Sequence, residues 1–248
     1  MGKFRYSFAV ALSIFISLSF ANAKEKTKET QLKAKWHKTL SIPESSDVVF
    51  DSTNNHLYIV SDRGALYETD TAGIILRKSK LEGLDFEGID LLGDQLYISD
   101  ETPRKVYCVN KHTLEQPWVK QIQWGGALNK AYETICYNPV TKRFILIAEA
   151  PPVIVEYDTA FNKIDQHYFK YARDINSAKF FNGFVYLLSS KDRKIFKCNA
   201  TTLEPLESYI INVYNAEGLC FTPQGNIYVV SDDWQRLYYF EAFKKSTE

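Results

Sequence analysis

Residues 86–101 read FEGIDLLGDQLYISDE, and this stretch carries the pattern that decides the fold. A short apolar segment is followed by a turn at Gly93 and Asp94, and then by an aromatic and aliphatic segment that ends in Asp100 and Glu101. Apolar segments on either side of a glycine-containing turn are typical of a β-hairpin. The stretch therefore predicts two antiparallel strands with acidic residues at one end.

The same unit occurs four more times in the chain. The other copies are SDVVFDSTNNHLYIVSD at 46–62, YETICYNPVTKRFILIAE at 132–149, SAKFFNGFVYLLSS at 177–190 and AEGLCFTPQGNIYVVSD at 216–232. Aligned on Ser46, Glu87, Glu133, Ser177 and Glu217, the copies are spaced by 41, 46, 44 and 40 residues. A period of ~40 to 45 residues with several short strands is typical of a β-propeller blade.

A third strand follows each pair, and a more polar fourth strand follows in the first four copies, at 74–77, 118–122, 164–168 and 206–210. The fifth copy ends at Phe243, before a fourth strand, whereas residues 33–41 have the same alternating pattern and precede the first copy. Closing the ring with this segment removes exposed sheet edges. We therefore predict an all-β, five-bladed β-propeller whose ring is closed by an N-terminal strand pairing into the last blade. An open solenoid or sandwich gives that strand no role.

The N-terminus has the pattern of an export signal. Lys3 and Arg5 precede an apolar run at 8–20, and the small residues 21–23 follow it. We expect a signal peptide at 1–23, a linker at 24–31, a single propeller domain at 32–243 and a C-terminal tail at 244–248. The run is shorter than the ~20 residues of a membrane-spanning helix, so we expect no membrane span after cleavage and a periplasmic or secreted protein.

Composition limits the partners. Loss of Lys3 and Arg5 with the signal leaves 28 basic residues against 30 acidic ones, so no basic patch predicts nucleic-acid binding. We expect a monomer whose partner is an unknown small ligand, peptide or envelope protein. The four cysteines fall on non-adjacent repeats or outer strands, which favours buried free thiols over disulfides; they are Cys108, Cys136, Cys198 and Cys220.

Acidic residues recur at one end of the repeat. In a propeller the start of each first strand and the end of each second strand lie on the same face, so two acidic sets converge there. Glu87, Glu133 and Glu217 begin first strands, and the second set comprises Asp62, Asp100, Glu101, Glu149, Asp232 and Asp233. Hard divalent cations prefer oxygen ligands, and Ca²⁺ tolerates irregular geometry better than Mg²⁺. The converging carboxylates therefore predict a Ca²⁺ site at this face. The alternative is that each glutamate binds main-chain N–H groups of neighbouring blades without a metal.

The blade-by-blade order of these motifs resembles the SdiA-regulated (YjiK-like) family over roughly 38–241, with Phe86-Glu87-Gly88-Ile89 and Ala216-Glu217-Gly218-Leu219 among the matching segments. That family is a five-bladed propeller distantly similar to NHL-repeat proteins, and a calcium site has been associated with the family. The resemblance implies the same fold and a Ca²⁺ site. It carries over to Glu87, Glu133 and Glu217, with Asp100, Glu101 and Glu149 as neighbours.

Three functions are compatible with this pattern. The first is a calcium-binding module or scaffold of the cell envelope, whose receiving surface includes aromatic residues such as Trp118, Trp124, Tyr132, Tyr171, Tyr214 and Trp234. The alternative for each aromatic residue is packing between blades. The second function is a calcium-dependent hydrolase, of lactonase, esterase or phosphoesterase type, but we expect all four histidines outside the channel and assign no catalytic residue. Nucleic-acid binding ranks last.

Overall fold

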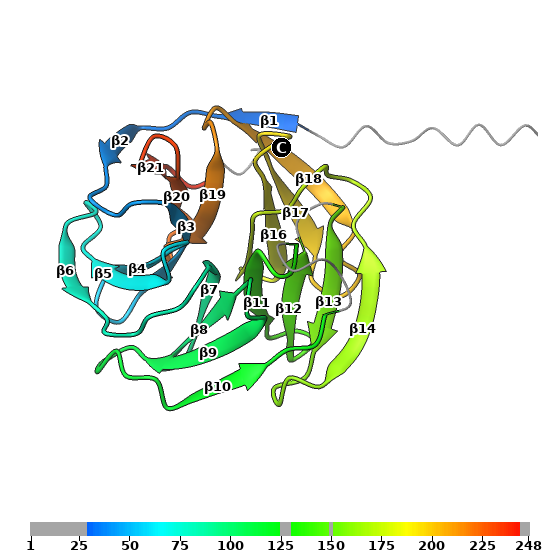
Figure 1. The fold of residues 1–248 in the computed structure, drawn as a ribbon. Coiled ribbons are helices and arrows are strands. Elements are labelled where there is room, and N and C mark those ends of the chain that lie inside the picture. The colour runs from blue at the N-terminus through cyan, green and yellow to red at the C-terminus, as the bar shows by residue number, and fades with distance from the viewer. Residues whose placement is uncertain (1–28, 125–129, 149–150, 244–248) are drawn as a thin grey trace, which may run out of the picture.

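The computed structural model describes residues 29–124, 130–148 and 151–243, and these residues form five sheets arranged as a ring (Figure 1). The predicted five-bladed propeller is therefore confirmed. Within the described ranges, no helix is both long and apolar enough to span a membrane.

In each blade the first strand lies at the channel and the fourth at the rim, and these four strands pair antiparallel. Blade 1 comprises β3 (Ser45–Asp51), β4 (His56–Ser61), β5 (Ala65–Thr69) and β6 (Ile75–Lys78). Blade 2 comprises β7 (Phe86–Leu92), β8 (Gln95–Asp100), β9 (Lys105–Asn110) and β10 (Trp118–Gln121). Blade 3 comprises β11 (Thr134–Asn138), β12 (Arg143–Ala148), β13 (Val153–Tyr157) and β14 (Lys163–Tyr168). Blade 4 comprises β15 (Ser177–Phe181), β16 (Phe184–Ser189), β17 (Lys194–Asn199) and β18 (Pro205–Ile211).

Blade 5 contains the closure. Its strands are β19 (Ala216–Phe221), β20 (Ile227–Ser231) and β21 (Arg236–Phe240), and its fourth strand is the N-terminal β2 (Trp36–Thr39), which pairs antiparallel with β21. The ring of Trp36 stacks on that of Tyr239 with 5.1 Å between centroids. The predicted closure by residues 33–41 is thus confirmed, and the first and last segments of the propeller share one sheet.

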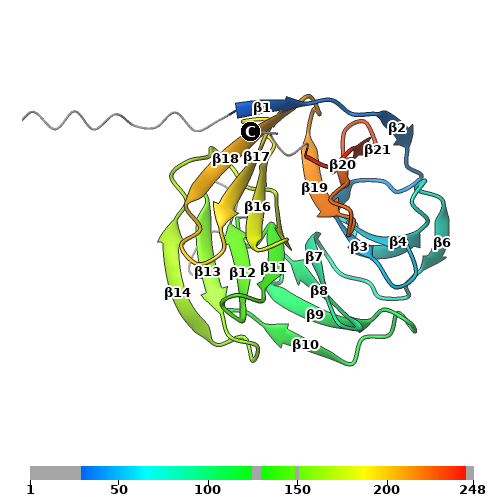
Figure 2. The same ribbon diagram turned by 180° about the vertical axis from the view of Figure 1, so that it is seen from behind.

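A further N-terminal strand, β1 (Glu29–Leu32), pairs parallel with β18 and gives blade 4 a fifth strand. Both views of the ring show β1 along the outer edge of β18 before the chain continues to β2 (Figure 2). The sequence pattern predicted a linker at 24–31 and gave no sign of this pairing. The N-terminal segment therefore spans the junction of blades 4 and 5, contacting both.

The hydrophobic core lies between blades. Each of the five junctions has its own cluster of buried aliphatic and aromatic side chains, including the junction of blades 5 and 1. Tyr132 is part of the cluster between blades 2 and 3, so packing explains this aromatic residue. All four cysteines are buried and free, as predicted.

Near the axis, side-chain acceptors join the first strands of neighbouring blades. Asp47 accepts the N–H of Ile89 at 3.0 Å, Thr134 accepts that of Ala178 at 3.0 Å, and Ser177 accepts that of Leu219 at 3.3 Å. Because these donors lie on strands that have no main-chain partner across the junction, the side chains satisfy buried N–H groups. The equivalent positions in blades 2 and 5 are occupied by Gly88 and Gly218, which have no side chain.

Those two glycines are required by close approach. A Cβ atom at Gly218 would lie 2.5 Å from the Cα atom of Asp47, and one at Gly88 would lie 2.6 Å from the main-chain nitrogen of Ile135. Such distances are too short for a real Cβ contact, so the recurring Glu-Gly dipeptide combines an acid at the channel end with a residue small enough for the axis.

Candidate functional site

The acidic residues converge at one end of the channel because of a repeated irregularity in the hairpins. The pairing of first and second strands skips one residue at Ser46, at Glu87 and at Glu217. A β-bulge of this kind re-aims the extra side chain out of the ladder. In blade 1 the bulged Ser46 then lies beside Asp62, the residue that follows the second strand, and its hydroxyl donates to the Asp62 carboxylate.

Blade 4 differs from the sequence alignment by one residue. Ser177 was aligned with Glu87, but its hydroxyl is buried and donates to Asp47 Oδ1 at 2.8 Å. The residue at the bulge position is Asn176, whose Oδ1 accepts the N–H of Ser190 at 3.1 Å and whose Nδ2 donates to Glu217 Oε2 at 2.8 Å. The order around the channel end is therefore Ser, Glu, Glu, Asn, Glu.

Three carboxylates come together at blade 2. Asp85, Glu87 and Glu101 each offer an oxygen within 4.8 Å of the others. Two further acidic residues lie close enough to affect Glu87: the charges of Glu133 and Asp62 both raise its pKa. We call these five residues the acidic mouth.

The electrostatics of the acidic mouth disfavour simultaneous ionisation of its carboxyl groups. Burial, and then the charges of its acidic neighbours, raise the pKa of Glu87 well above its usual range. Burial likewise raises the pKa of Asp62 to about 6, with Asp232 and Asp85 adding to the shift, and burial raises the pKa of Glu101. Carboxylates whose charged forms are destabilised in this way either bind protons or share a positive ion.

Two acids in this region have roles that the sequence did not reveal. Asp100 was a candidate ligand, but its carboxylate is almost fully buried and accepts the N–H groups of Leu84 at 3.2 Å and Asp85 at 2.9 Å. It thereby holds the loop that presents Asp85. Asp85 was missed, although it lies two residues before Glu87, and its Oδ2 accepts the hydroxyl of Thr102 at 2.6 Å.

The remaining candidates divide by location. Glu133 lies with Glu87 in the acidic mouth, whereas Glu217 accepts a hydrogen bond from Asn176 of blade 4. Glu149 lies outside the described residues. None of the four histidines is in the acidic mouth: His37 and His167 are on the outer strands β2 and β14, and the other two pair with acids elsewhere, His56 with Glu68 and His112 with Asp94.

A second group with metal-binding side chains lies on the outer strands of blade 3. Glu156, Asp165 and His167 each offer a ligand atom within 4.8 Å of the others. Arg143 Nη1 is 3.0 Å from Glu156 Oε2, so a cation there would compete with an existing ion pair. This group is the second candidate metal site, against which the acidic mouth has to be tested.

Below the acidic mouth a buried ion pair crosses the channel. Lys179 Nζ of β15 lies 2.6 Å from Asp47 Oδ2 of β3, and both side chains are almost fully buried. The pair joins blades 1 and 4 through their first strands. No feature of the repeat pattern pointed to Lys179.

Known proteins resemble this chain in fold and, through one family model, in sequence. Glutaminyl cyclase from Myxococcus xanthus aligns with a TM-score of 0.73 at 14% identity over 87% of this chain and 98% of its own. A protein of unknown function from Bacteroides caccae aligns with a TM-score of 0.54 at 12% identity over 75% of this chain and 70% of its own. These likenesses concern the fold alone, and no curated protein matches the sequence. The SdiA-regulated family model matches residues 21–241, and the chain therefore belongs to the SdiA-regulated family.

Proposed function

We propose that this protein is an exported calcium-binding β-propeller that acts as a binding or scaffolding module in the cell envelope, with the metal held in the acidic mouth. The observation that carries the proposal is the convergence of Asp85, Glu87 and Glu101 oxygens within 4.8 Å in a place where burial disfavours their charges. The export signal expected at 1–23 supports a location in which extracellular or periplasmic calcium is accessible.

The donor set favours calcium over other cations. All the ligands in the acidic mouth are carboxylate oxygens, and no histidine or cysteine of the chain lies there, which argues against Zn²⁺ or copper. The five blades contribute different side chains at equivalent positions, so the geometry is irregular. Ca²⁺ accepts six to eight oxygen ligands in flexible arrangements, whereas Mg²⁺ demands a near-ideal octahedron.

Exposed aromatic side chains on the loops near this end support a binding role. Tyr214 precedes β19 and is 56% exposed, and Trp234 follows β20 and is 52% exposed. Trp234 stacks with the guanidinium of Arg236 at 4.4 Å. Exposed aromatic rings beside a charged site are common features of recognition surfaces, because they contribute apolar area and polar edges together.

Calorimetric titration of calcium into chelator-stripped protein tests the metal site. We expect one calcium site that is weakened at least tenfold by Glu87→Gln. Glu82→Gln is the matched control, because Glu82 lies in the loop that leads into β7 and is exposed. His167→Ala tests whether the group of Glu156, Asp165 and His167 on blade 3 binds the calcium instead. Binding that survives Glu87→Gln but is lost in His167→Ala would reject the acidic mouth as the calcium site.

The alternative function is a calcium-dependent hydrolase. A carboxylate of the acidic mouth would have to serve as the base, because the histidines lie elsewhere. Calcium-dependent cleavage of lactone, carboxylic ester or phosphoester substrates that is lost in Glu87→Gln would favour this function. Calcium binding without any such turnover favours the binding module.

A further inference from the structure

At the end of the channel opposite the acidic mouth lies a pocket of about 330 Å³. Its walls come from the ends of the first strands β3, β7, β15 and β19, and from Lys111 in the turn after β9. Lys179 of the buried pair with Asp47 also lines this pocket. We call it the lower pocket.

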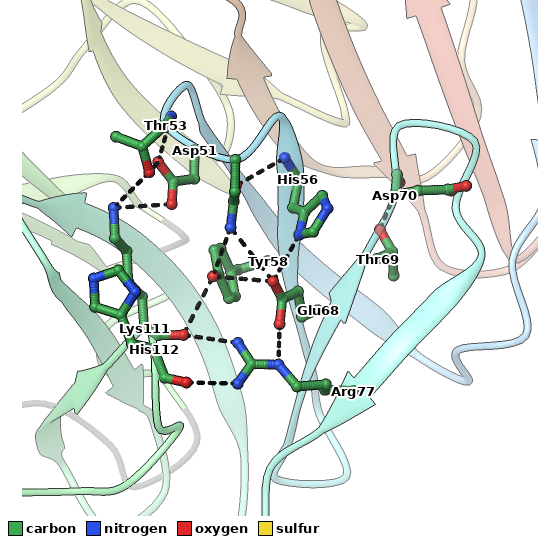
Figure 3. A network of polar contacts seen from close by, with 11 residues as sticks. Asp51, Thr53, His56, Tyr58, Glu68, Thr69, Asp70, Arg77, Lys111 and His112 are labelled. Carbon is green, nitrogen blue, oxygen red and sulfur yellow. Dashed lines mark hydrogen bonds and ion pairs between the residues drawn. The ribbon is translucent and has the colours of Figure 1, made fainter.

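On one wall of the lower pocket the positive charge of Lys111 is paired with the negative charge of Asp51. Lys111 is 2% exposed, and its Nζ lies 2.9 Å from Asp51 Oδ2 and donates to Thr53 Oγ1 at 3.0 Å. Figure 3 shows this contact next to the network that ties blade 1 to blade 2, in which Arg77 donates to the carbonyls of Lys111 and His112. The ammonium group of Lys111 is thus paired with the Asp51 carboxylate, and Arg77 binds the turn that contains Lys111.

The other lysine in the lower pocket is also paired. Lys179 is 3% exposed, and its Nζ lies 2.6 Å from Asp47 Oδ2. The two lysines of the pocket therefore each have a buried carboxylate partner. Neither of them is left to attract an anion.

Asp90 differs from the other two carboxylates. It is 9% exposed, lines the lower pocket, and accepts the N–H of Tyr137 on Oδ2 at 2.6 Å. Among the residues whose placement is described, no basic side chain forms an ion pair with it. A buried carboxylate that has only main-chain donors is stabilised further by a cation at contact distance.

The surroundings of Asp90 also favour a bound cation. Burial raises its pKa to about 6, with Lys179 opposing the shift and Asp47 adding to it. Aromatic rings line the same pocket: Phe181 stacks on Phe221 with 4.7 Å between centroids, and Phe50 lies on the adjoining strand. Aromatic faces attract organic cations and exclude water from the carboxylate.

We propose that the lower pocket binds a small organic cation, with its ammonium group at Asp90 and its apolar part against the phenylalanine rings. The volume lies at the lower end of the range for small-molecule sites and suits a ligand the size of an aromatic amine. The site is distinct from the acidic mouth, because none of the five residues of the acidic mouth lines the lower pocket.

Three probes of similar size and different charge test the proposal on the native protein. Benzylamine is a cation at neutral pH, benzyl alcohol is neutral and benzoate is an anion. Titrations followed by calorimetry in the presence of chelator keep the result separate from calcium binding. We expect benzylamine to bind at least tenfold more tightly than benzyl alcohol and benzoate. Equal binding of all three, tighter binding of benzoate, or no binding of benzylamine would overturn the proposal.

A variant locates the bound cation. Asp90→Asn keeps an oxygen that can accept the Tyr137 N–H but removes the charge, so benzylamine affinity should fall at least tenfold. Asp165→Asn, an exposed carboxylate on β14, removes the same net charge at the rim and should leave the affinity within twofold. Unchanged affinity in folded Asp90→Asn would overturn the assignment. If that variant does not fold, the comparison of the three probes decides the matter.

Discussion

Lys179 Nζ and Asp47 Oδ2, separated by 132 positions in the sequence, lie 2.6 Å apart at the centre of the ring. Asp47 Oδ2 also accepts the N–H of Ile89, and Asp47 Oδ1 accepts the hydroxyl of Ser177. One carboxylate thereby connects blades 1, 2 and 4. The interaction exists only when the ring is closed, because its partners come from opposite sides of the channel.

Loss of Lys179 should destabilise the propeller. Lys179→Met leaves the fully buried carboxylate of Asp47 without its cation, and breaking a buried pair in this way costs about 3–5 kcal/mol. Chemical denaturation of both proteins measures the change in the free energy of unfolding. The double variant Asp47→Asn with Lys179→Met should recover part of that loss, and a single variant as stable as the native protein would show that the pair has no structural role.

Removal of one charge from the acidic mouth should stabilise the metal-free protein. Glu87→Gln abolishes repulsion from Glu133, Asp62 and Asp85, so we expect a gain on the order of 1 kcal/mol in chelator, a usual size for single substitutions. Thermal unfolding in chelator measures it. Glu82→Gln, at an exposed position nearby, should have no effect. A loss of stability in Glu87→Gln would instead indicate that Glu87 supports the fold through hydrogen bonds.

The metal-free protein should become more stable as the pH falls from 7.5 to 5. The pKa of Asp62 is about 6 in the folded protein and 3.8 ordinarily, so the folded state binds the proton more tightly than the unfolded state. The destabilisation is therefore present above pH 6 and is relieved as the pH falls through that value. Saturating calcium should remove or reverse this trend. A melting temperature that falls over this range in chelator would contradict the assigned pKa shifts.

The N-terminal strand β2 should be essential for the closed ring. Deleting residues 24–39 removes β2 and exposes the edge of β21, which invites pairing with other chains. We expect a lower melting temperature and concentration-dependent aggregation, measured by calorimetry and light scattering. Deleting only 24–34 removes β1 and should have the smaller effect. Equal stability of the native and 24–39-deleted proteins would show that closure does not depend on this strand.

The sequence was sufficient for the architecture because the relevant signals are local. Strand alternation, turn residues and a repeat of 40 to 46 residues define each blade, and the missing fourth strand of blade 5 pointed to its N-terminal substitute at 36–39. The parallel pairing of β1 with β18 has no such signal. It depends on where the closed ring happens to expose an edge.

The site was predicted only in part. Glu87, Glu101 and Glu133 were identified because they recur at the ends of strands, and they do lie in one region. The role of Asp100 was not apparent, since its neighbours Leu84 and Asp85 belong to a loop whose path no repeat specifies. In blade 4 the choice between Asn176 and Ser177 depended on a hairpin register that differs by one residue.

Thermal unfolding of residues 24–248 in chelator, then with calcium or with magnesium, is the most direct test of calcium binding in the acidic mouth. At a calcium concentration about 100 times the dissociation constant, binding adds about 2.7 kcal/mol to stability. For a domain of this size that corresponds to a rise in melting temperature of roughly 5–10 °C. We predict this rise with calcium, a much smaller one with magnesium, and its loss in Glu87→Gln. An identical melting temperature under all three conditions would contradict a calcium site in the acidic mouth.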